Sequence, residues 1–287
     1  MVSMNKLSTT ERAAIVSALV EGNSIRATCR MTGAAKNTVV KLLMELGEAC
    51  WKYQSETMRN LKCERFQADE IWAFCYSKQR NVPEDKKGQF GVGDVWTWTA
   101  LCADCKVVPT FLVGNRDAEY AEVFLRDLSQ RLARRVQLTT DGHKAYLVAV
   151  ERVFGSAIDY SQLVKLYGKP VDAPEARYSP PECVGTQTHV ISGKPDIAHV
   201  STSYVERQNL NMRMGMRRFT RLTNGFSRKW QNLEAAESLY FLHYNFARPH
   251  TTLSKPYPMT PAMKAGVSDH VWTVAEIVGL LDREDSN

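Results

Sequence analysis

The segment 66-FQADEIWAF-74, from Phe66 to Phe74, begins with alternating apolar and polar side chains, a pattern that favours a β-strand. Two more segments rich in β-branched and aromatic residues follow, 95-VWTWTAL-101 and 107-VVPTFLV-113. The link Ala103-Asp104 between these two is short, which predicts an antiparallel hairpin. The sequence therefore predicts a three-strand antiparallel meander.

The chain on either side of the meander completes an α/β pattern. Residues 117–134 have helical periodicity and Val136–Thr140 is strand-like, which predicts a mixed α/β layer fold. Residues 152–200 are rich in proline and are interpreted as an insertion, with a candidate strand in Ile158–Tyr167. Helices are predicted again at Ser203–Leu222, Trp230–Asn245 and Val271–Leu281, the last within a tail over residues 253–287.

Capping signals at the start of the chain predict three short helices. Ser8-Thr-Thr-Glu11 is a capping box ahead of a helix that reaches Val20. Ser24 caps a second helix, Gly33 turns the chain, and a third helix starts at about Ala35. This pattern predicts an N-terminal helix-turn-helix domain over residues 1–55.

In a helix-turn-helix motif, the first residues of the second helix meet base edges in the major groove. That geometry makes four polar residues the candidates for DNA contact: Lys36, Asn37, Thr38 and Lys41. The alternative is a small helical bundle whose polar side faces water.

Composition sets limits on the class of protein. The 287 residues are 44% hydrophobic and 24% charged, which predicts a folded protein of one large domain plus a small one. The net charge is +6. No run is long enough to span a membrane and the first residues are polar, so a cytoplasmic protein is expected.

Seven cysteines are scattered along the chain, an odd number that favours reduced thiols over a secreted disulfide framework. Cys102-Ala-Asp-Cys105 has the spacing of a zinc-ligand pair. No second pair of cysteines or histidines completes four ligands, so this segment is interpreted as a tight turn between two strands.

Two carboxylates stand out in the predicted sheet. Asp141 directly follows the strand Val136–Thr140, and the carboxyl end of a strand is where α/β sheets commonly place ligand-binding groups. Asp69 lies inside an apolar strand, where a carboxylate is costly to bury without a partner or a metal. Strand alternation sends Asp69 and Glu70 to opposite faces, so only one of them is expected to join Asp141. The residues leave that choice open.

A third carboxylate, Glu206, lies in the first turn of the predicted helix Ser203–Leu222. Its plainest interpretation is a capping box with Ser203. At about 100° per residue, however, Arg213, Arg217 and Arg221 fall on the same side of the helix as Glu206. That face would suit a phosphate backbone, and the alternative is a solvated surface helix.

Several motifs together resemble bacterial insertion-sequence DDE transposases, most closely single-frame members of the insertion-sequence-one group. The motifs are 68-ADEIW-72, 93-GDVWTW-98, 138-LTTDGH-143, 204-YVERQN-209 and 244-YNFARPH-250. The resemblance implies an RNase H-like catalytic domain over residues 60–252 with Asp69, Asp141 and Glu206 as catalytic residues and metal ligands. It thereby selects Asp69 over Glu70.

The resemblance also implies two Mg²⁺ or Mn²⁺ ions and an activity on double-stranded DNA. Such an enzyme cleaves the terminal inverted repeats of a transposon and joins the 3′ ends to target DNA. A homodimer or larger multimer on DNA, located at the bacterial nucleoid, is expected. The alternatives are a metal-dependent nuclease without strand transfer and a helix-turn-helix repressor, although the repressor leaves the carboxylates unexplained.

Overall fold

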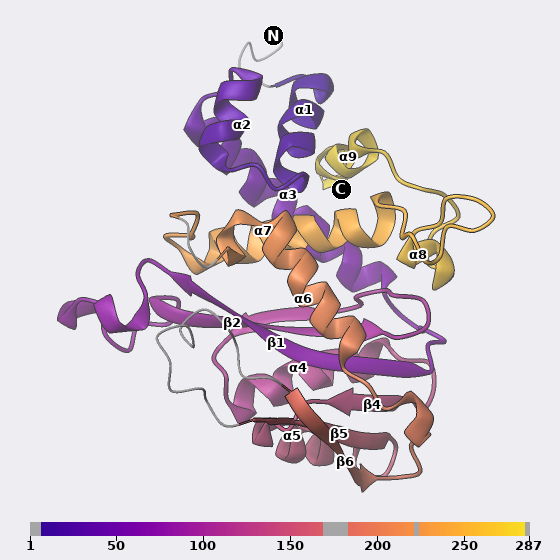
Figure 1. Ribbon diagram of the computed structural model, residues 1–287. Helices are drawn as coiled ribbons and strands as arrows, with labels where there is room; N and C mark the ends of the chain where they lie inside the picture. Colours follow the sequence, from indigo (N-terminus) through magenta and orange to yellow (C-terminus); the bar gives the residue numbers. More distant parts are fainter. Residues whose placement is uncertain (1–6, 169–182, 221–223, 285–287) are drawn as a thin grey trace.

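A computed structural model describes residues 7–168, 183–220 and 224–284 of the chain. Its six-stranded sheet has the order β3-β2-β1-β4-β5-β6 (Figure 1). Strands β1, β2 and β3 pair antiparallel, as the meander predicted. Strand β4 is parallel to β1, β5 is parallel to β4, and β6 is antiparallel to β5. The strands are β1 (Arg65–Cys75), β2 (Gly93–Cys102), β3 (Phe111–Gly114), β4 (Gln137–Thr140), β5 (Asp159–Tyr167) and β6 (Cys183–Ser192).

The third strand is shorter than expected. The prediction was a strand over Val107–Val113, but β3 begins only at Phe111. Pro109 has no N–H to give to a ladder. The Val108 N–H donates to Asn245 Oδ1 at 3.0 Å, and the Val108 carbonyl accepts from Asn245 Nδ2 at 2.8 Å. A side chain thus replaces the neighbouring strand at these residues.

The segment interpreted as an insertion contributes to the sheet. Asp159–Tyr167 forms β5, where a strand was expected, and Cys183–Ser192 forms β6. The prolines at 170, 174, 180 and 181, which suggested the insertion, lie outside the described residues.

Helices cover both faces of the sheet (Figure 1). On one face, the Trp98 ring of β2 packs against Phe124 of α4 (Ala118–Arg131) and Tyr146 of α5 (Lys144–Phe154). On the other face, the Thr97 hydroxyl donates to Glu237 of α7 (Trp230–Leu242) at 3.0 Å. Helix α6 (Ser203–Gly215) crosses β1 and β2, and a π-helical turn (His243–Ala247) continues α7. The short helical turns are Gln79–Asn81, Glu84–Lys86, Ile197–His199, Arg217–Phe219 and α8 (Pro261–Lys264).

The three N-terminal helices form as predicted. They are α1 (Thr9–Val20) with its capping box, α2 (Ile25–Thr32) capped by Ser24, and α3 (Lys36–Thr57). Gly33 has φ 73°, the left-handed conformation that favours glycine. Helix α3 extends to pack on α7, and α9 (Val274–Glu284) packs on α1 and α3. One continuous apolar core therefore joins the first helices to the sheet. Among the described helices, none is both long and apolar enough to cross a membrane.

Helix α6 ends earlier than expected. The prediction ran to Leu222, but the helix stops at Gly215, and Met216 is extended with φ −133° and ψ 110°. Met216 and Phe219 are both buried, so the chain turns into the core where another helical turn would have kept it at the surface. Arg217 consequently lies in a separate short turn, and the predicted arginine stripe does not exist as one helix face. Arg221 lies outside the described residues.

Candidate active site

The parallel pairing of β1 with β4 brings two of the predicted carboxylates together. The last paired residues are Ala68 and Thr140, so the next residue on each strand, Asp69 and Asp141, lies at the same edge of the ladder. Oxygens of Asp69, Glu70 and Asp141 all lie within 4.8 Å of one another. We refer to these three residues as the acidic cluster.

The presence of Glu70 corrects the expectation that only one carboxylate of β1 would join Asp141. Alternation does place Asp69 and Glu70 on opposite sides of the strand. Since β4 ends at Thr140, however, β1 has no partner on that side beyond Ala68, and the carboxylate of Asp141 can be approached from both sides. The prediction assumed a continuous sheet at this point, and the sheet is open there.

Glu70 and Asp69 differ in their partners. The Glu70 side chain is fully buried and accepts from Arg116 Nε at 3.1 Å, while its Oε1 atom has no hydrogen-bond partner. Among the described residues, Asp69 has no cationic partner: Oδ1 accepts from the Glu70 N–H and Oδ2 from Asn209 Nδ2, both at 2.8 Å. A guanidinium therefore compensates the charge of Glu70, whereas only neutral donors bind Asp69.

Burial and neighbouring charge disfavour the ionised form of Asp69. Burial is the largest cause, followed by the charges of Glu70 and Asp141, and Glu206 adds a smaller contribution; together they raise the pKa of Asp69 to about 7. Burial and the charge of Asp141 also raise the pKa of Glu70, against the effect of Arg116. The cluster thus has more negative charge than its own neighbours offset.

Two neutral side chains hold α6 beside the cluster. Gln67 of β1 accepts from the N–H groups of Tyr204 and Val205 at 2.8 and 3.1 Å, which satisfies the start of the helix. One turn further along, Asn209 donates to Asp69. These contacts lie on both sides of Glu206 in the sequence, so β1 sets the position of that carboxylate.

The capping interpretation of Glu206 is wrong. The cap residue of α6 is Thr202, and the Ser203 N–H donates to Ser201 Oγ. The Glu206 carboxylate instead accepts from Lys165 Nζ at 2.6 and 2.5 Å and from the Thr202 hydroxyl at 2.7 Å. The cation that pairs with it is therefore a lysine of β5, which no sequence pattern singles out.

The structure also places the residues expected to contact DNA. Lys36, Asn37 and Lys41 are exposed at the start of α3, Thr38 is half-buried, and Lys41 Nζ lies 3.6 Å from a Glu45 oxygen. These residues lie at the opposite end of α3 from the sheet (Figure 1). Of the arginines, Arg213 is half-buried on α6 and Arg217 is exposed.

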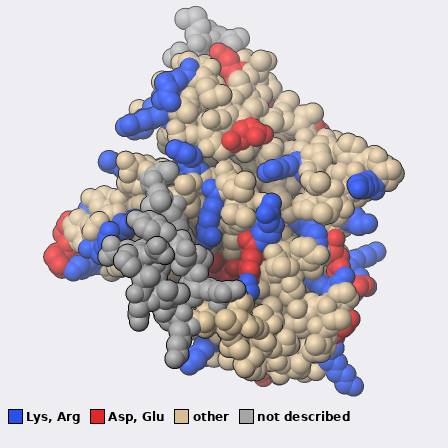
Figure 2. Space-filling view, viewed as in Figure 1, with Lys and Arg blue, Asp and Glu red and all other residues tan. Residues whose placement is uncertain are grey.

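Basic groups surround the acidic site. Figure 2 shows acidic side chains near the centre of one face, with lysine and arginine side chains beside and above them. A cavity of about 350 Å³ lies along α6 and has three cationic residues in its lining, Lys106, Arg207 and Arg248. This cavity can accommodate an anionic group such as a phosphate.

No protein-family model matches the sequence, and no curated protein does. Among solved structures, the chain is similar to the Mos1 mariner paired-end complex with Mn, at 10% identity and a TM-score of 0.33, covering 98% of this chain and 78% of that chain. For the Mos1 strand transfer complex, the identity is 14% and the TM-score is 0.24, and the match covers 83% of this chain and 78% of that chain. For the Mos1 paired-end complex with the left transposon end, the identity is 13% and the TM-score is 0.23, and the match covers 56% of this chain and 60% of that chain. Structural similarity this weak does not assign a function to the chain.

The donor set fits a hard divalent cation. Every ligand atom offered is a carboxylate oxygen, the type that Mg²⁺ prefers. A dication would also offset the excess negative charge that raises the pKa of Asp69.

Metal binding should therefore stabilise the protein more strongly at higher pH. An aspartate whose pKa is about 7 when folded and about 3.9 when unfolded costs stability as the pH rises between those values. Metal binding removes that cost, because it requires the ionised form. We expect the increase in melting temperature on adding Mg²⁺ or Mn²⁺ to be larger at about pH 8 than at about pH 6. An equal increase at both pH values would argue against metal binding at Asp69.

Proposed function

We propose that the chain is a DNA transposase of the DDE type, in which Asp69, Asp141 and Glu206 hold two Mg²⁺ or Mn²⁺ ions. The observation that carries the proposal is the meeting of Asp69 and Asp141 where the pairing of β1 with β4 ends. Gln67 and Asn209 tie the first turns of α6, which carry Glu206, to the same strand β1. The antiparallel meander followed by strands parallel to β1 supports an RNase H-like catalytic domain.

Metal ions bound there would supply Lewis-acid stabilisation to the attacking and leaving oxygens of a phosphodiester. The protein's own part is positioning. Asn209 orients the Asp69 carboxylate, and the His143 N–H holds Asp141 Oδ1 at 2.9 Å. Lys165 offsets the charge of Glu206, the residue that would hold a metal on this side of the site. Arg116 keeps Glu70 occupied, so Glu70 supports the site without being one of the three ligands.

The basic residues around the site would bind the DNA. The exposed start of α3 would read base edges, while Arg213, Arg217 and the cavity along α6 would take backbone phosphates. Double-stranded transposon ends and target DNA are the proposed substrates, and two or more copies of the chain would hold the paired ends.

An assay of cleavage and joining tests the proposal against its alternatives. DNA carrying the inverted repeats that flank the gene is incubated with the full chain, Mg²⁺ and a target plasmid. A transposase yields both cleaved 3′ ends and joined products. Cleavage without joining would favour the nuclease alternative, and sequence-specific binding without cleavage would favour the repressor.

Base readout by α3 gives a further prediction. In the full chain, Asn37→Ala should reduce the preference for transposon-end DNA over scrambled DNA, at a cost of about 1–3 kcal/mol per lost base contact. Lys264→Gln is a matched control, because Lys264 lies in α8, away from α3. Titrations at one fixed salt concentration measure both affinities. An unchanged preference in Asn37→Ala would remove α3 from base recognition.

A further inference from the structure

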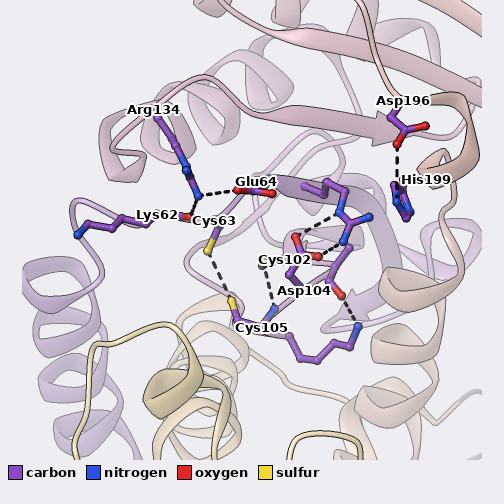
Figure 3. A network of polar contacts seen from close by, with 12 residues as sticks. Lys62, Cys63, Glu64, Cys102, Asp104, Cys105, Arg134, Asp196 and His199 are labelled. Carbon is purple, nitrogen blue, oxygen red and sulfur yellow. Dashed lines mark hydrogen bonds and ion pairs between the residues drawn. The ribbon is translucent and has the colours of Figure 1, made fainter.

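Three buried thiols meet at the end of β2, where the sequence offered only a pair. Cys63 comes from the segment just before β1, and Cys102 and Cys105 flank the turn after β2 (Figure 3). The three sulfurs all lie within 4.8 Å of one another, and the Cys63 and Cys105 sulfurs are 3.5 Å apart. The predicted tight turn is present at Cys102–Cys105, and folding adds a third thiol from 39 residues upstream of Cys102.

The spacing of the sulfurs suits a tetrahedral thiolate site. A zinc ion bound at about 2.3 Å to each sulfur places the sulfurs about 3.8 Å apart. The Cys63–Cys105 separation of 3.5 Å is close to that value, and the 4.8 Å limit on the other two separations is compatible with it, whereas a disulfide requires about 2.05 Å between the two sulfurs.

The backbone of the turn supports the same arrangement. The Cys105 N–H points at Cys102 Sγ, at 3.4 Å, which is the kind of contact that stabilises a thiolate. Lys106 follows in the left-handed region with φ 63°, a conformation that costs a non-glycine residue free energy. The turn is further tied to β1, since the Ala103 N–H donates to the Arg65 carbonyl at 2.8 Å. These bonds hold both sulfurs of the turn toward Cys63.

We propose that Cys63, Cys102 and Cys105 form a binding site for one thiophilic metal ion of the zinc class, with a water molecule or another small donor as the fourth ligand. Thiolates select ions such as Zn²⁺ over Mg²⁺, so this site and the acidic cluster would bind different metals. Three thiolates and a dication leave one net negative charge. Lys106, which donates to the Ala103 carbonyl, lies at the turn and can offset it, while the nearby Arg65 is already paired with Asp104.

The ion would be structural. It would fasten the end of β2 to the start of β1, the strand that carries Asp69 and Gln67. Metal bound only by the folded chain stabilises that chain. This proposal is independent of the proposed DNA chemistry.

Metal content and cobalt spectroscopy of the full chain test the site. The protein is prepared with Asp69→Asn and Asp141→Asn, so that metal at the acidic cluster does not count, and is kept reduced. We expect one zinc ion per chain after desalting, and thiolate-to-metal charge-transfer absorption when Co²⁺ replaces it. A chelator should lower the melting temperature of this protein.

Cysteine variants assign the ligands. Cys63→Ser and Cys105→Ser should each weaken zinc binding by more than the 10- to 100-fold typical of residues that merely contact a ligand, roughly 100-fold or more. Cys50→Ser is the matched control, because Cys50 is equally buried but lies in α3, outside the thiol group. Reduced protein without bound zinc, or a cobalt spectrum without thiolate bands, would overturn the proposal even if the serine variants fail to fold. So would a Cys63–Cys105 disulfide in place of the metal.

Discussion

Asp141→Asn and Asp69→Asn should each reduce metal-dependent cleavage of transposon-end DNA by at least about 100-fold, more than the loss of an outer-shell partner costs. Both changes preserve side-chain size and remove a charged oxygen from the acidic cluster. Combining them should cost little beyond one, since ligands of one metal site act as a unit. Single-turnover cleavage at saturating DNA measures the effect.

Stability should not fall along with activity. Because burial raises the pKa of Asp69, its ionised form is costly to the folded protein in the absence of metal, and asparagine removes that cost. We expect the melting temperature of Asp69→Asn without metal to equal or exceed that of the wild type. A large drop would mean that the lost activity reflects unfolding.

Glu70→Gln is the matched control on the same strand. Its carboxylate is fully buried beside Arg116 and its pKa is raised by burial, as for Asp69, so we expect Glu70→Gln to leave the free energy of unfolding little changed. Cleavage should fall less than in Asp69→Asn. If instead Glu70→Gln abolished cleavage while Asp69→Asn retained it, the catalytic role would pass to Glu70.

Glu206→Gln should have the second largest effect, a loss of cleavage of about 100-fold, because a neutral amide binds a hard dication poorly. Its stability should change little: the ion pair with Lys165 is partly exposed, and such pairs contribute about 0–1 kcal/mol. The same assay and a thermal melt measure both quantities.

Lys165→Met separates metal binding from loss of the ion pair. It breaks the same pair as Glu206→Gln but leaves the carboxylate in place. We expect Lys165→Met to keep cleavage well above that of Glu206→Gln and to bind Mg²⁺ at least as tightly as the wild type, since a competing cation is gone. Equal losses in the two variants would mean that Glu206 acts only through Lys165.

Local patterns predicted most of the secondary structure. Capping residues such as Ser8 and Ser24 bond within a few residues, so the sequence fixes the starts of α1 and α2. The meander also followed from alternation and a short link. Errors arose where a distant residue competes: Asn245 takes the hydrogen bonds of Val108, and burial of Met216 ends α6.

The candidate site was predictable only in part, because residues distant in the sequence decide many of its contacts. The placement of Asp141 after a strand could be read locally, but the partners of each carboxylate come from elsewhere in the chain. Glu206 has the spacing of a capping box with Ser203, yet in the folded chain its carboxylate forms an ion pair with Lys165 of β5. Cys63 joins Cys102 and Cys105 because β1 and β2 are paired, but the meander pattern alone does not predict which residues meet across that pair.

A change of metal specificity tests most directly whether a metal ion binds at Asp141. Asp141→Cys replaces a hard oxygen ligand with a softer sulfur, which favours Mn²⁺ over Mg²⁺. Cleavage of transposon-end DNA by the variant is compared in the two metals, with the wild type as reference. The account predicts that Asp141→Cys is nearly inactive in Mg²⁺ and regains cleavage in Mn²⁺, so that its Mn²⁺-to-Mg²⁺ rate ratio rises by about tenfold or more above that of the wild type. A variant that cleaves in Mg²⁺ like the wild type, or whose rate ratio is unchanged, would contradict a metal ion bound at Asp141.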